Sequence, residues 1–305
     1  EPAALAMTAA IPTRPVRGVY RSRRHANLRV IDKENGGKAD SLNAGINFCQ
    51  SPFFCAMDAD SLLERDALSR IIRPFLLDAT TVAVGGVIRI ANGCTIDNGL
   101  VKDVRLPRRL LERFQVMEYL RAFLSGRMGW DALGATLIIS GAFGVFRRAT
   151  VVAAGGYATD TVGEDMELVV RLHRHCRELG ARYRVAFVPD PVAWTECPSS
   201  LAVLGRQRDR WQRGLIESLS RHRVMFLNPR YGRVGLFAFP YFYVLEMLGP
   251  VIEFCGYINF FALLITGHLS GLHAAALLAV AIIFGVALSL AAIGLEELSF
   301  RRYPR

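Results

Sequence analysis

The sequence lacks the cysteine patterns of a zinc site or a disulfide framework. Its six cysteines include no C-x-x-C pair and no cluster with histidine at ligand spacing. It has no low-complexity tract, internal repeat or signal peptide, which excludes disorder, collagen and a small secreted scaffold. We interpret the cysteines as reduced thiols in the core of a cytosolic domain. Because no Met opens the chain and Arg305 ends it without a tail, we expect a piece of a longer protein.

Lysine and arginine are absent from residues 234–294, where Glu246 and Glu253 are the only acidic side chains. The chain of 305 residues has a net charge of +10; residues 295–305 carry +1, which leaves +11 on the part before this stretch. A soluble globular protein does not separate basic from apolar residues in this way, whereas a basic domain followed by membrane helices does. We therefore predict a domain over residues 1–232 and a membrane region over residues 233–305.

The membrane region is predicted to hold one interfacial helix and two spans. Residues 236–248 are rich in aromatic side chains and interrupted by Pro240, which suits a helix in the membrane interface. Spans of about 249–266 and 274–294 follow it. The region is therefore expected to be multi-pass.

The distribution of arginine predicts the orientation of these spans. Arg233 precedes them and Arg301 and Arg302 follow them, whereas the linker 267–273 contains no Lys or Arg. The positive-inside rule then places both flanks, and the domain, in the cytoplasm. We expect a protein of the plasma (inner) membrane, with these arginines at lipid headgroups.

The domain alternates between short apolar runs and helical segments. Runs at 28–31, 53–57 and 81–90 predict strands, with helices over 38–48 and up to Leu77 between them. This alternation predicts an α/β fold with a mainly parallel sheet covered on both faces.

Two basic helices follow the same reasoning at about 107–128 and 201–223. Apolar side chains recur in each at spacings of three and four, with arginine on the opposite face. We expect both to lie against the domain or the membrane surface.

Asp58 and Asp60 follow the apolar run 53–57 with one residue between them. Open α/β sheets bind ligands at the carboxyl ends of their strands, and two such carboxylates can hold a divalent cation on a diphosphate. Alternatively, they are acids beside a helix start, where Ser61 and Glu64 form a capping-box pattern.

Glu164 and Asp165 lie in the first turn of a helix predicted to end near Leu179. A carboxylate that faces a cleft there could take a proton from an acceptor hydroxyl as its oxygen attacks. The alternative, which the pair alone favours, is an ordinary placement of acids near the positive end of a helix dipole.

Gln207, Arg210 and Trp211 form a Q-x-x-R-W pattern in the second basic helix. A guanidinium can bind phosphate oxygens in a forked geometry, and an indole offers a flat face for a sugar ring. An interfacial helix anchored by its Trp explains the composition equally well.

Two weaker features are Lys38 and the pair Ser140-Gly141. Lys38 follows a Gly-Gly turn at a predicted helix start, where its ammonium and backbone amides could meet a phosphate, although a plain turn explains it nearly as well. Ser140 and Gly141 mark a bend in an apolar stretch.

The order of these motifs resembles the processive, inverting glycosyltransferases of family 2, such as the cellulose, chitin, hyaluronan and poly-N-acetylglucosamine synthases. A Q-x-x-R-W motif downstream of E-D and just before membrane helices is specific to such enzymes, and the likeness covers nearly the whole chain. It implies a cytoplasmic GT-A domain over residues 1–232, truncated at its N-terminus. It also implies further membrane helices after Arg305 and a base-binding Asp upstream of Glu1.

The resemblance implies how the donor is held. Asp58 and Asp60 would bind Mg²⁺ or Mn²⁺ on the donor diphosphate, which Lys38, Gln207 and Arg210 would also approach. The donor would be a nucleotide sugar, with UDP as the expected nucleotide.

The resemblance also implies how the acceptor is used. Asp165 would be the general base, Glu164 would lie close to the acceptor, and Trp211, Ser140 and Gly141 would line its site. Attack opposite the leaving diphosphate would convert an α-linked donor into a β-linked product. Expected partners are a polysaccharide or glycolipid acceptor, the lipid bilayer, and accessory export or regulatory subunits, but no nucleic acid.

Two other functions stay open. A non-processive transferase would carry the same motifs but add one sugar to a lipid or lipid-linked acceptor. In a non-enzymatic basic protein of the membrane surface, the acids would only cap helices. Gly163 stands where cellulose synthases often have Thr, and Ser140-Gly141-Ala142 stands where the family often has Cys-Gly-Ser.

Overall fold

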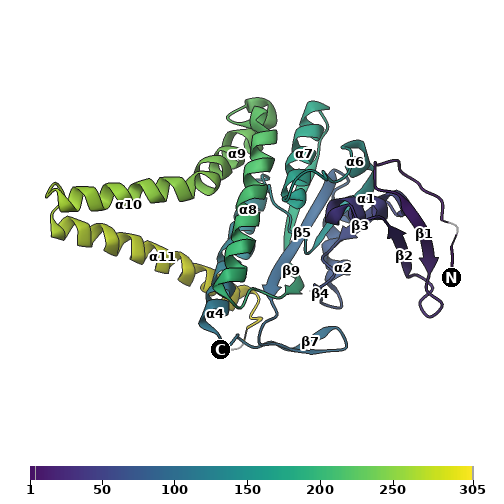
Figure 1. Ribbon diagram of the computed structural model, residues 1–305, viewed down its shortest axis with the longest axis horizontal. Coiled ribbons are helices and arrows are strands. Elements are labelled where there is room, and N and C mark those ends of the chain that lie inside the picture. Colours follow the sequence, from purple (N-terminus) through teal and green to yellow (C-terminus); the bar gives the residue numbers. More distant parts are fainter. Residues whose placement is uncertain (4, 304–305) are drawn as a thin grey trace.

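The computed structural model describes residues 1–3 and 5–303. A mixed sheet flanked by helices forms the body of the molecule, and a long helical hairpin projects from one side of it (Figure 1). Arg305, the predicted cut end, lies outside the described residues.

The central sheet is mixed, not mainly parallel as predicted. Its strand order is β3 (Phe53–Ala56), β8 (Gly144–Arg147), β5 (Thr81–Ile90), β9 (Arg184–Thr195) and β4 (Leu62–Leu63). Only β5 and β9 pair in parallel among these described strands. The α/β class is confirmed, but β8 runs antiparallel between β3 and β5, so the parallel arrangement is wrong.

Helices pack against this sheet in two separate apolar cores. One core contains residues of α1 (Gly37–Phe48), α6 (Arg148–Ala153) and α7 (Glu164–Glu178). The other contains residues of α2 (Ala67–Ile71), α3 (Arg73–Leu77) and the helical segment 110–132. All ten residues of β5 are buried, which explains why this strand reads as a continuous apolar run.

Two hairpins lie outside the central sheet. β1 (Val16–Arg21) pairs with β2 (Arg29–Lys33), and β6 (Thr95–Asp97) pairs with β7 (Leu100–Asp103). The strand predicted at 28–31 is therefore part of β2, and its assignment to the main sheet is wrong. Leu28 and Val30 are exposed, so this run does not contribute to the core.

Both predicted basic helices are present. The first runs through α4 (Leu110–Glu118), the π-helix η1 (Tyr119–Gly126) and α5 (Arg127–Ala132). The second is α8 (Leu201–Arg221), which begins after Ser200, whose side chain accepts a hydrogen bond from the backbone of Val203. Their position at a membrane surface stays a prediction.

The predicted membrane region forms a helical hairpin (Figure 1). An irregular helical stretch, Val234–Met247, bends by 49° into α10 (Gly249–Ile265), and α11 (Gly271–Ser299) follows. α11 is long and apolar enough to cross a membrane, and the bent pair passes the same test only as one broken span. The described residues therefore hold one candidate span, or two, where the sequence predicted an interfacial helix and two spans.

The end of α11 packs back onto the domain. Glu296 Oε2 accepts a hydrogen bond from Arg89 Nη2 of β5 at 2.6 Å, and both side chains are buried. Arg302 pairs with Glu64 at 3.0 Å, so the expectation that Arg302 faces lipid headgroups is wrong. The C-terminal end of the hairpin thus meets the domain that precedes it, and the placement of both flanks on one side of a membrane stays a prediction.

The six cysteines are free thiols, but only some belong to the core. Cys176 and Cys197 are buried, whereas Cys55 and Cys255 are exposed. The interpretation of all six as core thiols is therefore wrong for the exposed pair.

Candidate active site

Lys38 is the centre of a charged cluster. Its ammonium is ion-paired with Asp58 and lies 3.3 Å from Glu164 Oε1. Burial lowers the pKa of Lys38, but the hydrogen bond to Asp58 and the charges of Asp58, Glu164 and Asp165 outweigh burial and raise the pKa above its usual value. Three of the acids singled out in the sequence therefore interact with one cation.

The cluster forms where one strand and two helices meet. Gly37 has φ +85°, a left-handed conformation that suits glycine, and this turn leads into the first residues of α1. Asp58 follows the end of β3, and Glu164 is the first residue of α7. Strand ends and helix N-termini are the places where α/β folds bind phosphorylated ligands.

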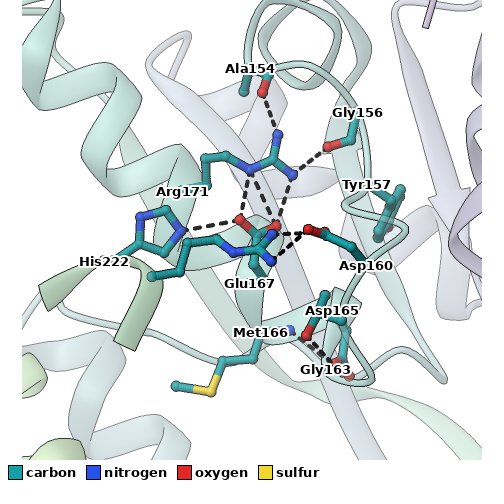
Figure 2. Close-up of polar contacts among 12 residues, drawn as sticks. Ala154, Gly156, Tyr157, Asp160, Gly163, Asp165, Met166, Glu167, Arg171 and His222 are labelled. Carbon is teal, nitrogen blue, oxygen red and sulfur yellow. Dashed lines mark hydrogen bonds and ion pairs between the residues drawn. The ribbon is translucent and has the colours of Figure 1, made fainter. Parts of the chain in front are cut away.

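Backbone amides hold the carboxylate of Asp165 in one orientation. Its Oδ2 accepts a hydrogen bond from the backbone of Gly141 at 2.8 Å. Its Oδ1 accepts one from the backbone of Met166 at 2.8 Å, and Figure 2 shows Asp165 beside Met166. A Cβ atom at Gly141 would lie 2.6 Å from Lys38 Nζ, so a side chain there would displace the lysine ammonium. Gly141 therefore lies against Lys38 and Asp165, whereas the acceptor-side role that the resemblance implied for Ser140 and Gly141 stays a prediction.

Asp60 is exposed and takes no part in the hydrogen bonds or ion pairs of the described residues. Among the described residues, no group of three or more His, Cys, Asp or Glu side chains is arranged so that it could hold a metal ion. Magnesium and similar hard cations bind one or two carboxylates together with substrate phosphates and water. Asp58 and Asp60 offer the oxygen ligands that such an ion prefers, and their role as its ligands stays a prediction.

The Q-x-x-R-W residues lie on α8, and none of them contacts the Lys38 cluster through a hydrogen bond or ion pair among the described residues. Trp211 is half-buried and packs near the Phe123 ring, with 5.9 Å between centroids. The guanidinium of Arg208, a residue outside the motif, lies 4.3 Å from the Trp211 ring centroid and bonds to Glu118. Arg210 is exposed.

Gln207 differs from Arg210 because its Oε1 atom is buried without a hydrogen-bond partner in the described residues. An unpaired buried acceptor is costly, so it favours a ligand or water that donates to this oxygen. The role that the resemblance implied for Gln207 at the donor diphosphate stays a prediction.

A buried network behind the acidic pair was missed in the sequence. Glu167 accepts hydrogen bonds from Arg171 and pairs with His222 Nε2 at 3.1 Å (Figure 2). Burial raises the pKa of Glu167, but its hydrogen bonds to His222 and Arg171 outweigh burial and lower it. Arg171 also donates to the carbonyls of Ala154 and Gly156, so the network joins α7 to α8 and to the loop after α6. The i,i+4 spacing of Glu167 and Arg171 was the only available signal.

Arg127 is a second residue that sequence reasoning passed over. Its guanidinium stacks on the Phe123 ring at 4.5 Å, and Nη1 is buried without a hydrogen-bond partner in the described residues. Burial lowers the pKa of Arg127 to about 10, against an opposing effect of the Asp165 charge. A lone arginine in a basic helix carries no pattern that would have distinguished it.

Comparison with known proteins identifies a family for most of the chain. A family model described as "Glycosyltransferase like family 2" matches residues 14–214. A poly-beta-1,6-N-acetyl-D-glucosamine synthase from Staphylococcus aureus (strain COL) is 30% identical over 204 residues, and one from Staphylococcus epidermidis is 28% identical over 204 residues. Each match covers 67% of this chain and 45% of the relative, so the chain spans less than half of these synthases.

A solved structure has a similar fold. The mannosyltransferase PcManGT from Pyrobaculum calidifontis, in complex with GDP-Man and Mn²⁺, aligns with a TM-score of 0.54 at 21% identity. The alignment covers 88% of this chain and 68% of that one. At this identity the likeness establishes the fold, which is the GT-A fold of nucleotide-sugar transferases.

Proposed function

This chain belongs to the glycosyltransferase-like family 2, and on that basis we propose that it is an inverting β-glycosyltransferase that extends a polysaccharide at a membrane. The donor is a nucleotide sugar, with UDP as the proposed nucleotide. The observation that carries the proposal is the convergence of Lys38, Asp58, Glu164, Asp165 and the Gly141 backbone at one place.

Each group in the cluster has a task that follows from the chemistry of transfer. The leaving diphosphate gains negative charge as the anomeric C–O bond breaks. Lys38, at the centre of the cluster, would stabilise that charge. Asp58 and Asp60 would hold a Mg²⁺ or Mn²⁺ ion, which supplies further positive charge to the diphosphate. Arg210 is proposed to bind the same phosphates from α8.

Asp165 is proposed to accept the proton of the attacking hydroxyl. Its two backbone hydrogen bonds fix the carboxylate, which general base catalysis requires. The acceptor oxygen attacks the anomeric carbon opposite the diphosphate, so the configuration inverts. Trp211 would support the acceptor sugar through its exposed ring area, with Glu164, Ser140 and Gly141 nearby.

The hairpin of α10 and α11 supports a membrane location for the reaction. α11 is a candidate span, and only 6% of its most apolar window is buried within the protein. Its apolar side chains therefore need lipid or another protein to cover them. We propose that both flanks of the hairpin and the catalytic domain lie in the cytoplasm, and that the polymer grows beside these helices.

A panel assay tests the function. Membranes containing the full-length protein are incubated with individual nucleotide sugars and Mg²⁺ or Mn²⁺, and nucleotide release and product size are measured. We expect one donor to give release and a product ladder, with loss of both on chelation and recovery on adding the metal back. A single lipid-soluble product would contradict polymer synthesis, and no release from any donor would contradict the transferase.

A further inference from the structure

One face of α8 packs against the loop 160–163, which leads to Glu164 and Asp165. Gly214, Glu217 and Arg221 are spaced three and four residues apart, so they lie along the same side of the helix. This side faces residues 160–163, which directly precede α7 and Asp165.

Two sets of hydrogen bonds and one backbone contact join α8 to this loop. Glu217 Oε2 accepts hydrogen bonds from Thr161 Oγ1 at 2.7 Å and from the backbone of Val162 at 3.0 Å. Arg221 donates two parallel hydrogen bonds to Asp160, at 3.0 and 2.9 Å. These bonds lower the pKa values of Glu217 and Asp160, because they favour the charged carboxylates.

Gly163 and Gly214 form the tightest contact. A Cβ atom at Gly214 would lie 2.7 Å from the Cα of Gly163, and a Cβ at Gly163 would lie 2.7 Å from the Cα of Gly214. Backbone therefore packs on backbone, and neither position has a flexible side chain that could yield. Glu164 and Asp165 follow this contact directly, and Arg210 lies one helical turn before it on α8.

We propose that Gly214 and Glu217 are positioning residues that set the distance between the Asp165 base and the Q-x-x-R-W segment of α8. This inference rests on the proposed function of Asp165. The base belongs to α7 and the phosphate- and acceptor-binding residues to α8, so their relative position depends on this contact. A misplacement of about 1 Å at a reacting group can cost about 100-fold in rate.

Two alanine substitutions on α8 test the proposal as a matched pair. Gly214→Ala adds a methyl group against Gly163, whereas Gly205→Ala adds one where nothing lies within 4 Å. Both substitutions replace glycine by alanine within α8, so their effects on helix propensity are equal. We expect Gly205→Ala to stay within about twofold of wild type, and Gly214→Ala to lose on the order of 100-fold in kcat with the KM for the donor changed less than threefold.

Glu217 provides a rescue test. Glu217→Ala removes both hydrogen bonds to the loop and should lower kcat about tenfold or more, whereas Glu217→Gln keeps an acceptor oxygen and should recover most of the rate. Hydrogen exchange on the full-length protein follows the loop without needing activity. Amides 160–166 should exchange faster in Gly214→Ala and Glu217→Ala than in Gly205→Ala.

The outcomes distinguish failure of the positioning role from failure of the proposed transferase function. Loop exchange equal to that of Gly205→Ala, or an unchanged kcat in Gly214→Ala, overturns the positioning role while the transferase stands. A proportional loss of donor affinity and rate in Gly214→Ala also overturns it, because general damage would then explain the result. Full activity in Asp165→Asn would instead overturn the base assignment.

Discussion

At the scale of single residues, Lys38 allows three carboxylates to lie close together. The negative charges of Asp58, Glu164 and Asp165 would otherwise repel one another. The Lys38 ammonium offsets that repulsion, and the same carboxylates raise its own pKa.

The buried ring of His173 makes the free energy of unfolding depend on pH. Burial lowers its pKa from 6.5 to about 4, and the neutral ring bonds to the Thr136 carbonyl and the Tyr183 hydroxyl. The unfolded chain therefore binds a proton at this histidine more readily between these values. The contribution of His173 to stability is constant above about pH 6.5 and falls as the pH approaches 4, by on the order of 3 kcal/mol.

Apparent melting temperatures in detergent between pH 7 and pH 5 test this effect. His173→Gln should flatten the pH dependence, whereas the same change at exposed His25 should leave it unaltered. Equal slopes for wild type and His173→Gln would refute the assignment.

At this scale the sequence predicted the residues of the cluster but not those of the Glu167 network. Lys38, Asp58 and Asp165 stand in motifs whose order has a known counterpart. His222 and Arg171 have no such motif, because they join segments that approach only after α7 and α8 have packed. Nothing in local spacing specifies that approach.

At the element scale, Gly37 controls the entry into α1. Gly37→Ala places a side chain at φ +85° and should destabilise the protein by about 1–2 kcal/mol. Gly45, within the same helix, is exposed with open space around its Cα, so Gly45→Ala should stabilise the helix by about 0.5–1 kcal/mol. Thermal unfolding of the two variants should shift in opposite directions, and a shift in the same direction would contradict this account.

Strand and helix positions were predictable where the pattern was long. The ten buried residues of β5 and the periodic apolar positions of α8 identify those elements without ambiguity of type. β8 has only four residues, too few for its apolar pattern to indicate direction, so its antiparallel insertion could not be foreseen. Strand direction depends on tertiary pairing rather than on local composition.

At the scale of the whole molecule, Arg89 and Glu296 join the sheet to the hairpin of α10 and α11. The pair is buried, so Glu296→Leu would leave the Arg89 charge unpaired and should cost about 3–5 kcal/mol. Replacing both residues, as in Arg89→Met with Glu296→Leu, should recover much of that loss. Thermal unfolding in lipid nanodiscs compares the variants.

An exposed pair serves as the control for this link. Asp97 and Lys102 lie 3.7 Å apart on the surface, and Asp97→Asn should change stability by less than about 1 kcal/mol. If Glu296→Leu is no more costly than Asp97→Asn, the buried pair does not hold the hairpin to the domain. The sequence could not reveal this pair, because its partners are 207 residues apart and Glu296 ends an apolar run that reads as membrane.

The most direct test of the central claim is nucleotide release by Asp165→Asn in membranes that carry the full-length chain. Asparagine keeps the size of the side chain but cannot accept the proton, so release from the preferred nucleotide sugar should fall to background while the variant still inserts and folds. Asp103→Asn, at an exposed hairpin position away from the cluster, should release nucleotide as wild type does. Full activity in Asp165→Asn would contradict the account.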